Sequence, residues 1–226
     1  MQWKVGTDVK KQIVVIGLGR FGSSVCKELY GMGHDIMAID SNPETVSTMS
    51  DYASHTATAD ATDEGSLKSL GVRNFEFAIV AIGDDLQASV LCTLMLKELG
   101  VPKVWVKARD QQHQKILERI GADRVIQPEY EMGVRTAHHI DSEKVVDYIN
   151  LSENYSIIEL AASKKVIGKT LGELNIRKDY GCMILAIKHG EDVNIAPLLE
   201  DRVEAGDILI AMGHKDDLKR FEDKGL

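Results

Sequence analysis

The pattern of apolar and polar positions changes once along this chain, near Pro128. From Gln12 to Pro128, short runs rich in β-branched residues alternate with amphipathic segments of helical period. The short runs predict strands at residues 13–16, 36–39, 55–58, 77–82, 104–106 and 125–126. The amphipathic segments predict helices at residues 20–31, 43–52, 63–70, 86–99 and 111–120.

Strands that are apolar on both faces and separated by helices are typical of a parallel sheet that is covered on both sides. The crossovers between such strands are right-handed. We therefore predict an α/β, Rossmann-like doubly wound domain over residues 1–128.

After Pro128 the pattern predicts a different kind of domain. Residues 129–150 are predicted to form a helical connector of one or two helices. Residues 151–226 are predicted to form a small α+β domain, with strands in SIIELAA, CMILAIKHG, VNIA and DILIAMG and helices in KTLGELNI and HKDDLKRFEDKG. A domain of about 70 residues buries too little surface to be very stable alone. We therefore expect two copies to pair through this region.

Composition and charge narrow the class of protein. The chain has 226 residues, of which 44% are hydrophobic and 27% charged, and its net charge is −8. No block of Lys or Arg stands out, which argues against a nucleic-acid partner. No apolar run approaches the roughly 18–20 residues of a membrane-spanning helix. We expect a soluble cytoplasmic protein that reaches a membrane only through a partner.

The three cysteines, Cys26, Cys92 and Cys182, lie in apolar patterns. This placement predicts small buried thiols rather than a disulfide or a metal site.

A glycine-rich stretch follows the first predicted strand, with Gly17, Gly19 and Gly22 in the spacing G-x-G-x-x-G. Gly17 permits a tight turn, Gly19 lets a pyrophosphate approach the backbone, and Gly22 allows a helix to pack closely on a strand. The N–H groups that open the following helix favour a bound anion. Asp40 ends the second predicted strand, where a carboxylate binds ribose hydroxyls and repels a 2′-phosphate. The stretch therefore predicts a nucleotide or dinucleotide site.

Arg20 lies inside the glycine-rich stretch, at the start of the predicted helix. A cation at this position points across the phosphates and can neutralise a terminal one, which an NAD site does not need. This favours ADP or ATP as the ligand. The alternative is a solvated arginine, although its placement against the helix dipole is unfavourable.

Four further stretches resemble the RCK/KTN (TrkA-like) family of proteins that regulate potassium transport. They are ATADATDEGSLKSLGV, FAIVAIGDD, VWVKARD and EAGDILIAMGHKDDLKRFE. The resemblance extends from Gln12 to Gly225. Within the family, the arrangement of one amino-terminal and one carboxy-terminal half with no channel attached is most similar to the cytosolic subunits of Ktr-type potassium uptake systems, the KtrA/KtrC branch.

The resemblance implies ATP as the activating ligand and ADP as the inactivating ligand, with Arg20 at the terminal phosphate. It implies that Glu129 helps to bind a divalent cation, Mg²⁺ or Ca²⁺, at a dimer interface together with ATP. It also implies an octameric ring of four dimers beneath a dimeric, KtrB/KtrD-like membrane potassium-translocating subunit. The nucleotide-binding residues that it implies are Gly17, Gly19, Arg20, Phe21, Gly22, Asp40, Ser41, Asn42, Asp60, Ala61, Thr62, Gly83, Asp84, Lys107 and Arg109.

The carboxy-terminal half of this family can bind cyclic di-AMP between two copies. Carried onto this chain, that site falls at Ile176, Arg177, Ile184, Ala196 and Pro197. A solvated surface charge is the structural alternative for Arg177.

Other candidate residues also have structural alternatives. Asp60, like Thr62 and Asp63, is suited to cap the helix that follows it. Glu129 follows Pro128, where an acidic side chain complements the helix dipole.

Lys107 is suited to pair with Asp84 or Asp85. His138 and His139 are adjacent and fall on different helix faces, which predicts surface or interface residues rather than metal ligands.

The sequence favours a switch over an enzyme. A reductase needs a second domain large enough to build a substrate pocket, and the second domain here is small. The phosphate-loop signature G-x-x-x-x-G-K-[ST] is absent, as are G-x-S-x-G, H-E-x-x-H and C-x-x-C. We predict a nucleotide-gated regulatory protein. The alternatives are an NAD(H)-binding TrkA-like regulator and a small NAD-dependent reductase.

Overall fold

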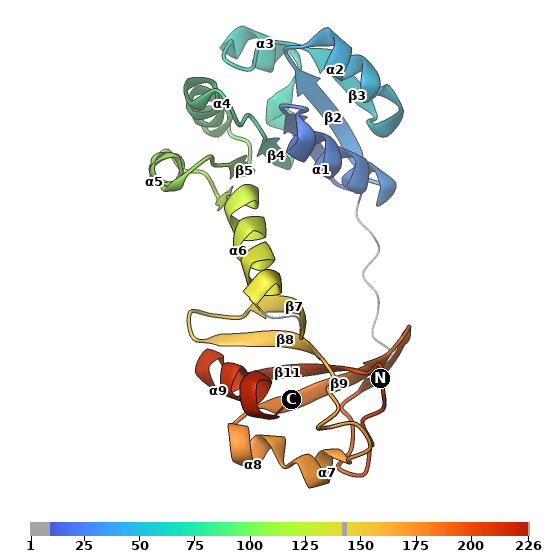
Figure 1. The fold of residues 1–226 in the computed structure, drawn as a ribbon. Coiled ribbons are helices and arrows are strands. Elements are labelled where there is room, and N and C mark those ends of the chain that lie inside the picture. The colour runs from blue at the N-terminus through green and yellow to red at the C-terminus, as the bar shows by residue number, and fades with distance from the viewer. Residues whose placement is uncertain (1–9, 142–143, 226) are drawn as a thin grey trace, which may run out of the picture. The chain divides into compact units, whose positions relative to one another are not determined.

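A computed structural model describes residues 10–141 and 144–225, except for the side chain of His138. The chain divides after Tyr130 into two compact units, here called unit 1 and unit 2. Figure 1 shows the course of the chain through both.

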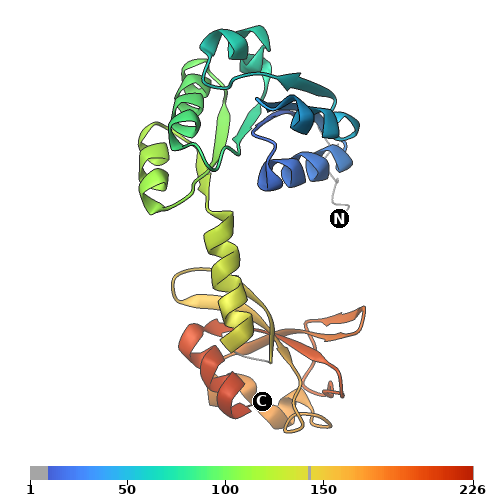
Figure 2. The ribbon, with the colours of Figure 1, turned by 45° about the horizontal axis from the view of Figure 1, so that its top comes forward.

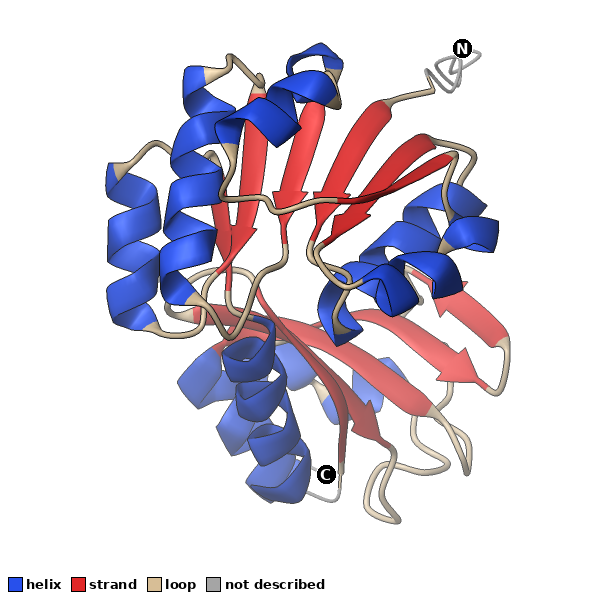
Figure 3. Ribbon diagram, turned by 90° about the horizontal axis from the view of Figure 1, so that it is seen from above, coloured by secondary structure: helices blue, strands red, loops and turns tan. Residues whose placement is uncertain are grey.

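Unit 1 is built on a six-stranded sheet in the order β3-β2-β1-β4-β5-β6, in which every pairing is parallel. The strands are β1 (Gln12–Ile16), β2 (Asp35–Asp40), β3 (His55–Thr58), β4 (Phe77–Val80), β5 (Lys103–Lys107) and β6 (Arg124–Ile126). The helices are α1 (Arg20–Gly31), α2 (Pro43–Thr48), α3 (Glu64–Ser69), α4 (Leu86–Glu98) and α5 (Gln111–Arg119), with the 3-10 turns η1 (Ser50–Tyr52) and η2 (Val72–Asn74). Helices lie on both sides of the sheet (Figure 3). The predicted doubly wound α/β fold is confirmed.

Strand β1 shows why the sheet is covered on both sides. Its side chains alternate between the two faces. Val14 and Ile16 belong to one buried cluster, and Ile13 and Val15 belong to the other. Because all four are apolar, each face of β1 needs a helical layer.

Two predicted elements of unit 1 are shorter than expected. The helix predicted at residues 43–52 ends at Thr48, and a 3-10 turn follows. The strand predicted at residues 77–82 ends at Val80. Residues 81–83 instead form a wall of the crevice described below.

Unit 2 contains a five-stranded antiparallel sheet in the order β10-β9-β11-β8-β7. Its strands are coloured from yellow to red in Figure 2. Helix α6 (Pro128–Asp141) leads into it from unit 1. The strands are β7 (Val145–Asn150), β8 (Tyr155–Ala161), β9 (Met183–His189), β10 (Asp192–Ile195) and β11 (Ile208–His214). The helices are α7 (Leu171–Leu174), α8 (Ile176–Tyr180), α9 (Lys215–Arg220) and a π-helical turn η3 (Phe221–Gly225). One apolar cluster, which includes Leu160, Leu209 and Phe221, holds these elements together.

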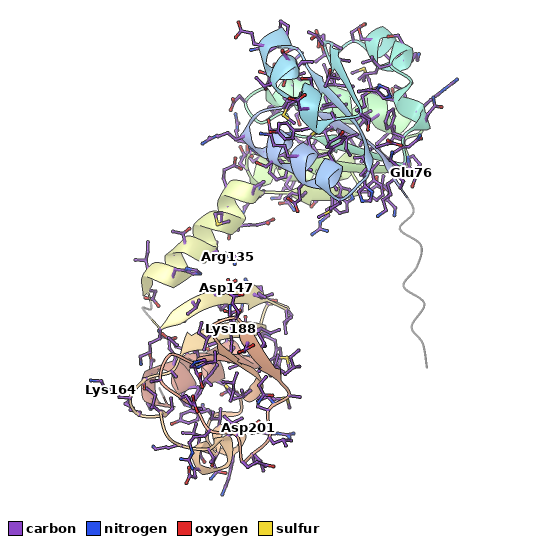
Figure 4. The ribbon with its side chains drawn as sticks, turned by 90° about the vertical axis from the view of Figure 1, so that its right-hand side faces the viewer. Glu76, Arg135, Asp147, Lys164, Lys188 and Asp201 are labelled. Carbon is purple, nitrogen blue, oxygen red and sulfur yellow. The ribbon has the colours of Figure 1, made fainter. Side chains whose placement is uncertain are left out.

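The second part of the predicted helical connector is wrong, because residues 145–150 form strand β7. This strand pairs with β8, with Tyr148 opposite Ile158 and Ile149 opposite Ile157. The β-branched and aromatic residues of this segment suit a strand, and pairing with a neighbouring strand decides between the two structures. Figure 4 shows Arg135 of α6 and Asp147 of β7, whose side chains form an ion pair of 2.5 Å.

The three cysteines and His139 lie in the environments that the sequence predicts. Cys26, Cys92 and Cys182 are buried, as predicted. His139 is exposed. The side chain of His138 lies outside the described part of the chain.

The burial of the His113 side chain leads us to predict that the stability of unit 1 depends on pH. This side chain is fully buried, its Nδ1 accepts the Arg109 backbone N–H at 3.2 Å, and its Nε2 has no partner among the described residues. Burial lowers the pKa of this imidazole, and the Arg109 charge opposes the smaller raising effect of Asp110. The native chain therefore holds fewer protons than the unfolded chain as the pH falls through the ordinary histidine pKa of about 6.5.

We expect the free energy of unfolding of unit 1 to fall as the pH drops from 7.5 through 6.5 and down to the lowered native pKa. Urea unfolding followed by Trp105 fluorescence, in a Trp3→Phe background, measures this loss. His113→Gln removes the titrating group and should flatten the dependence. An equally steep loss of stability in His113→Gln would assign it to other groups.

Candidate nucleotide site

A crevice of about 520 Å³ opens at the carboxyl ends of the strands of unit 1. Open α/β sheets bind ligands at this edge, where the strand order reverses. In this sheet β1 lies between β2 and β4, so the reversal falls at β1. The predicted residues that line the crevice are Gly17, Gly19, Asp40, Ser41, Asp60, Ala61, Thr62, Gly83 and Asp84.

The three glycines differ in what a side chain would meet. Gly17 has φ +90°, and a Cβ there would lie 3.0 Å from the backbone of Ala81 and Ile82. A Cβ on Gly22 would lie 1.9 Å from the Gly17 carbonyl oxygen. A Cβ on Gly19 would meet no protein atom within 4 Å. The chain's own packing therefore requires Gly17 and Gly22, whereas Gly19 leaves open space at the start of α1.

Asp40 is held in place by the backbone around it. The Leu18 N–H donates to Oδ2 at 2.7 Å, and the Asn42 N–H donates to Oδ1 at 2.8 Å. Each carboxylate oxygen keeps a lone pair that is not used by these bonds. The half-buried carboxylate is thus fixed in orientation and can still accept from two neighbouring hydroxyls.

Asp60 and Asp63 have separate structural roles. Asp63 caps α3 by accepting the Ser66 N–H, so Asp60 is not the cap of this helix. Asp60 instead accepts the Thr62 N–H at 2.8 Å and its hydroxyl at 2.7 Å. These bonds hold the pKa of the exposed Asp60 carboxyl below its usual value. The residue stays ionised beside the crevice at neutral pH.

Asp85 and Ala88 belong to the crevice wall but are missing from the predicted set, as are the apolar residues Ile16, Ala59, Ala81 and Ile82. Asp85 caps α4 by accepting the Ala88 N–H at 2.9 Å, and both residues line the crevice. An aspartate immediately before a helical pattern is an N-cap signal, so Asp85 could have been found from the sequence.

Other predicted site residues lie outside the crevice lining. Phe21 is half-buried in the first turn of α1. Asn42 caps α2 through its side-chain oxygen. The exposed Arg109 donates from Nε to Asp110 at 3.2 Å. Arg20 is exposed at the start of α1 and has no ion-pair partner among the residues that the structure describes.

Lys107 and Glu129 form an ion pair beside the crevice. Lys107 Nζ lies 2.6 Å from Glu129 Oε1. The predicted alternative, a pair of Lys107 with Asp84 or Asp85, is therefore wrong. The pKa of the Glu129 carboxyl is lowered mainly by the hydrogen bond from Lys107, and the charge of Arg20 adds to this effect. Arg20, Lys107 and Glu129 thus form one electrostatic cluster.

Unit 2 contains a separate cavity of about 740 Å³. Ile176, Arg177, Ile184, Ala196 and Pro197, the residues predicted for a cyclic dinucleotide, all line it. Its lining is mainly apolar, and the exposed Arg177 and Lys178 supply positive charge.

The described residues contain neither a cluster of metal ligands nor a membrane-spanning helix. Nowhere in residues 10–141 and 144–225 do three or more His, Cys, Asp or Glu side chains gather so that they could hold a metal ion. None of the helices in these ranges combines the length and apolar character of a membrane span.

Comparison with known proteins matches both units to one family. The TrkA-N domain matches residues 13–128, and the TrkA-C domain matches residues 155–224. Ktr system potassium uptake protein A of Bacillus subtilis is 53% identical, over 98% of this chain and 100% of that protein. Ktr system potassium uptake protein C of the same organism is 47% identical, over 96% and 99%. The crystal structure of the GsuK RCK domain superimposes with a TM-score of 0.68 at 19% identity, over 96% of this chain and 48% of that one.

A parallel sheet with a glycine-lined crevice at its carboxyl edge, joined to a small antiparallel unit, defines a two-domain RCK protein with a Rossmann nucleotide-binding fold. The chain belongs to the TrkA (RCK/KTN) family of potassium transport regulatory proteins, in the branch of the Ktr system potassium uptake proteins A and C.

Proposed function

We propose that this chain is the cytosolic regulatory subunit of a Ktr-type potassium uptake system and that ATP and ADP in the crevice of unit 1 control it. The observation that carries the proposal is the arrangement of the crevice itself. Gly19 leaves room for phosphates at the start of α1, and Asp40 is fixed where ribose hydroxyls can bind. Similarity to Ktr proteins over nearly the whole chain supports the assignment to potassium uptake.

Discrimination between ATP and ADP depends on one phosphate. Only a group that reaches this phosphate can favour one state of an assembly over another. We propose that Arg20 is that group, because it is exposed at the start of α1 and has no ion-pair partner among the described residues. A positioned guanidinium binds phosphate through charge-assisted hydrogen bonds.

We propose that Glu129 helps to bind a divalent cation, Mg²⁺ or Ca²⁺, together with ATP. Its side chain is 64% exposed and supplies oxygen ligands, as a hard cation requires. Magnesium is commonly bound by one or two carboxylates with phosphate and water oxygens, so a single carboxylate fits a site that the nucleotide completes. Such a cation would neutralise phosphate charge.

The side chains of the crevice are suited to a binding role. They are alkyl groups, the hydroxyls of Ser41 and Thr62, and carboxylates such as Asp40. These groups hold and orient a nucleotide. We therefore propose a switch that acts through differential affinity for two arrangements of an assembly.

We propose that the protein acts as a homo-oligomer, built from dimers into an octameric ring, and reaches the membrane through a KtrB/KtrD-like potassium-translocating partner. Exposed apolar side chains on unit 2 support pairing through this unit. Ile195, Leu198 and Leu199, at the end of the edge strand β10 and just after it, are 79%, 60% and 72% exposed, respectively. Burial of such side chains against a second copy would be favourable.

We propose a second ligand, cyclic di-AMP, for the cavity of unit 2. Its volume of about 740 Å³ and apolar lining suit adenine rings, and the positive charge of Arg177 suits phosphate.

Calorimetric titration of the purified full chain with ATP, ADP and NADH, with and without Mg²⁺, tests the main proposal. ATP and ADP should bind more tightly than NADH, and light scattering should report an assembly larger than a dimer. Tighter binding of NADH than of either ATP or ADP would replace the proposal with an NAD(H)-responsive regulator.

Arg177→Ala tests the second ligand. We expect the affinity for cyclic di-AMP to fall about tenfold, because a charge-assisted contact is lost, with ATP affinity unchanged. Unchanged cyclic di-AMP affinity would remove Arg177 from the site, and no binding to the parent chain would refute the second ligand altogether.

A further inference from the structure

The ion pair between Lys107 and Glu129 occupies the carboxylate that the proposed function assigns to a divalent cation. The two charged atoms lie 2.6 Å apart, which is typical of a strong charge-assisted hydrogen bond. The side chain of Lys107 is only 14% exposed, whereas that of Glu129 is 64% exposed. The side chain of Lys107 is therefore largely enclosed by the chain, whereas that of Glu129 lies at the surface.

The ammonium group of Lys107 also borders the nucleotide crevice. A Cβ on Gly83 would lie 3.2 Å from Lys107 Nζ, and Gly83 lines the crevice. Because Gly83 has no side chain, it leaves the ammonium group open to the crevice. Lysine carries a compact charge on a flexible stem, so the same group can turn from a carboxylate to a phosphate.

We propose that Lys107 is a resident cation that holds Glu129 in the nucleotide-free chain and that a nucleotide phosphate draws it away. Glu129 then becomes available to a divalent cation. The inference rests on the proposed function, because it takes the crevice to hold a nucleotide and Glu129 to bind the metal.

This arrangement makes binding of the cation conditional on the nucleotide. Without nucleotide, a divalent cation must compete with Lys107 for one carboxylate. With nucleotide, Lys107 has a phosphate partner and the competition ends. Each ligand therefore raises the affinity for the other by the same factor, as thermodynamic linkage requires. The pair acts as an internal block against a metal-bound, nucleotide-free state.

Terbium luminescence tests the first half of the inference in the absence of nucleotide. Tb³⁺ binds carboxylates, and Tyr130, adjacent to Glu129, can sensitise its emission. The difference between the parent chain and Glu129→Gln defines the signal from this site. We expect Lys107→Gln to tighten this Glu129-dependent binding about fivefold, because a competing exposed ion pair is removed. Lys107→Arg keeps the charge and should leave the affinity close to that of the parent chain.

ATP affinity in EDTA tests the second half. Breaking the ion pair opposes ATP binding in the parent chain, so Glu129→Gln should raise ATP affinity about threefold to fivefold when no metal is present. Part of this gain could come from removal of a negative charge near the phosphates. In a Lys107→Gln background there is no ion pair to break, so Glu129→Gln measures only the effect of the removed charge. The gain in ATP affinity should therefore be smaller there than in the parent chain.

Three results would overturn the inference: equal Tb³⁺ affinity in Lys107→Gln and the parent chain, no Glu129-dependent luminescence in any variant, or equal gains from Glu129→Gln in the two backgrounds. Failure of the proposed function has a different signature. In that case neither the parent chain nor any variant binds ATP, while the terbium measurement still decides whether Lys107 competes with a cation for the Glu129 carboxylate.

Discussion

Gly22→Ala is expected to destabilise unit 1 by about 3 kcal/mol and to abolish nucleotide binding. The added Cβ would lie 1.9 Å from the Gly17 carbonyl oxygen and 3.0 Å from the Ala81 side chain. Neither contact can be relieved by turning a flexible side chain, so α1 must move away from the sheet. Urea unfolding of the full chain and calorimetric titration with ADP measure the two effects.

Gly19→Ala is the matched control, because it adds the same methyl group three residues earlier. Gly19 has φ −62° and ψ −173°, which any residue adopts, and a Cβ there meets no protein atom within 4 Å. Stability should fall by only about 0.5 kcal/mol, since alanine is a poorer N-cap than glycine. Nucleotide affinity should fall at least about tenfold, because the methyl group occupies the space through which a phosphate approaches the backbone. Unchanged ADP affinity in Gly19→Ala, or native stability in Gly22→Ala, would contradict the described geometry.

The fold of unit 1 could be predicted because its signals are local. The apolar residues of β1, for example, supply both buried clusters, so the sequence pattern alone reveals a sheet covered on two sides. Strand β7 could not be predicted in this way. Residues 145–150 become a strand through pairing with β8, a partner that a local pattern does not reveal.

The same distinction between local and long-range signals applies to the residues of the candidate site. The turn at Gly17 and the placement of Asp40 at the end of β2 follow from local spacing and topology. The partner of Lys107 does not, because Glu129 is brought to it by the course of the chain from β5 through β6 to α6. Side-chain pairing between distant segments depends on tertiary structure, and spacing in the sequence carries no signal for it.

Arg20→Ala is expected to weaken ATP binding about tenfold to a hundredfold and to change ADP binding by less than about twofold. A guanidinium that contacts only the terminal phosphate contributes to the affinity for ATP and not to that for ADP. The fold should tolerate the substitution, because the side chain is exposed and a cation at a helix start opposes the helix dipole.

Arg20→Lys separates charge from geometry. Lysine keeps the positive charge but lacks the planar fork that binds phosphate oxygens in pairs. We expect its preference for ATP to lie between those of the parent chain and Arg20→Ala.

The ratio of the ADP and ATP dissociation constants, measured by calorimetry in Mg²⁺ for the parent chain and Arg20→Ala, decides whether Arg20 distinguishes the two nucleotides. We predict that this ratio favours ATP in the parent chain and falls about tenfold or more in Arg20→Ala. A ratio that is the same in both proteins would contradict it, whether the two affinities fall together or stay unchanged.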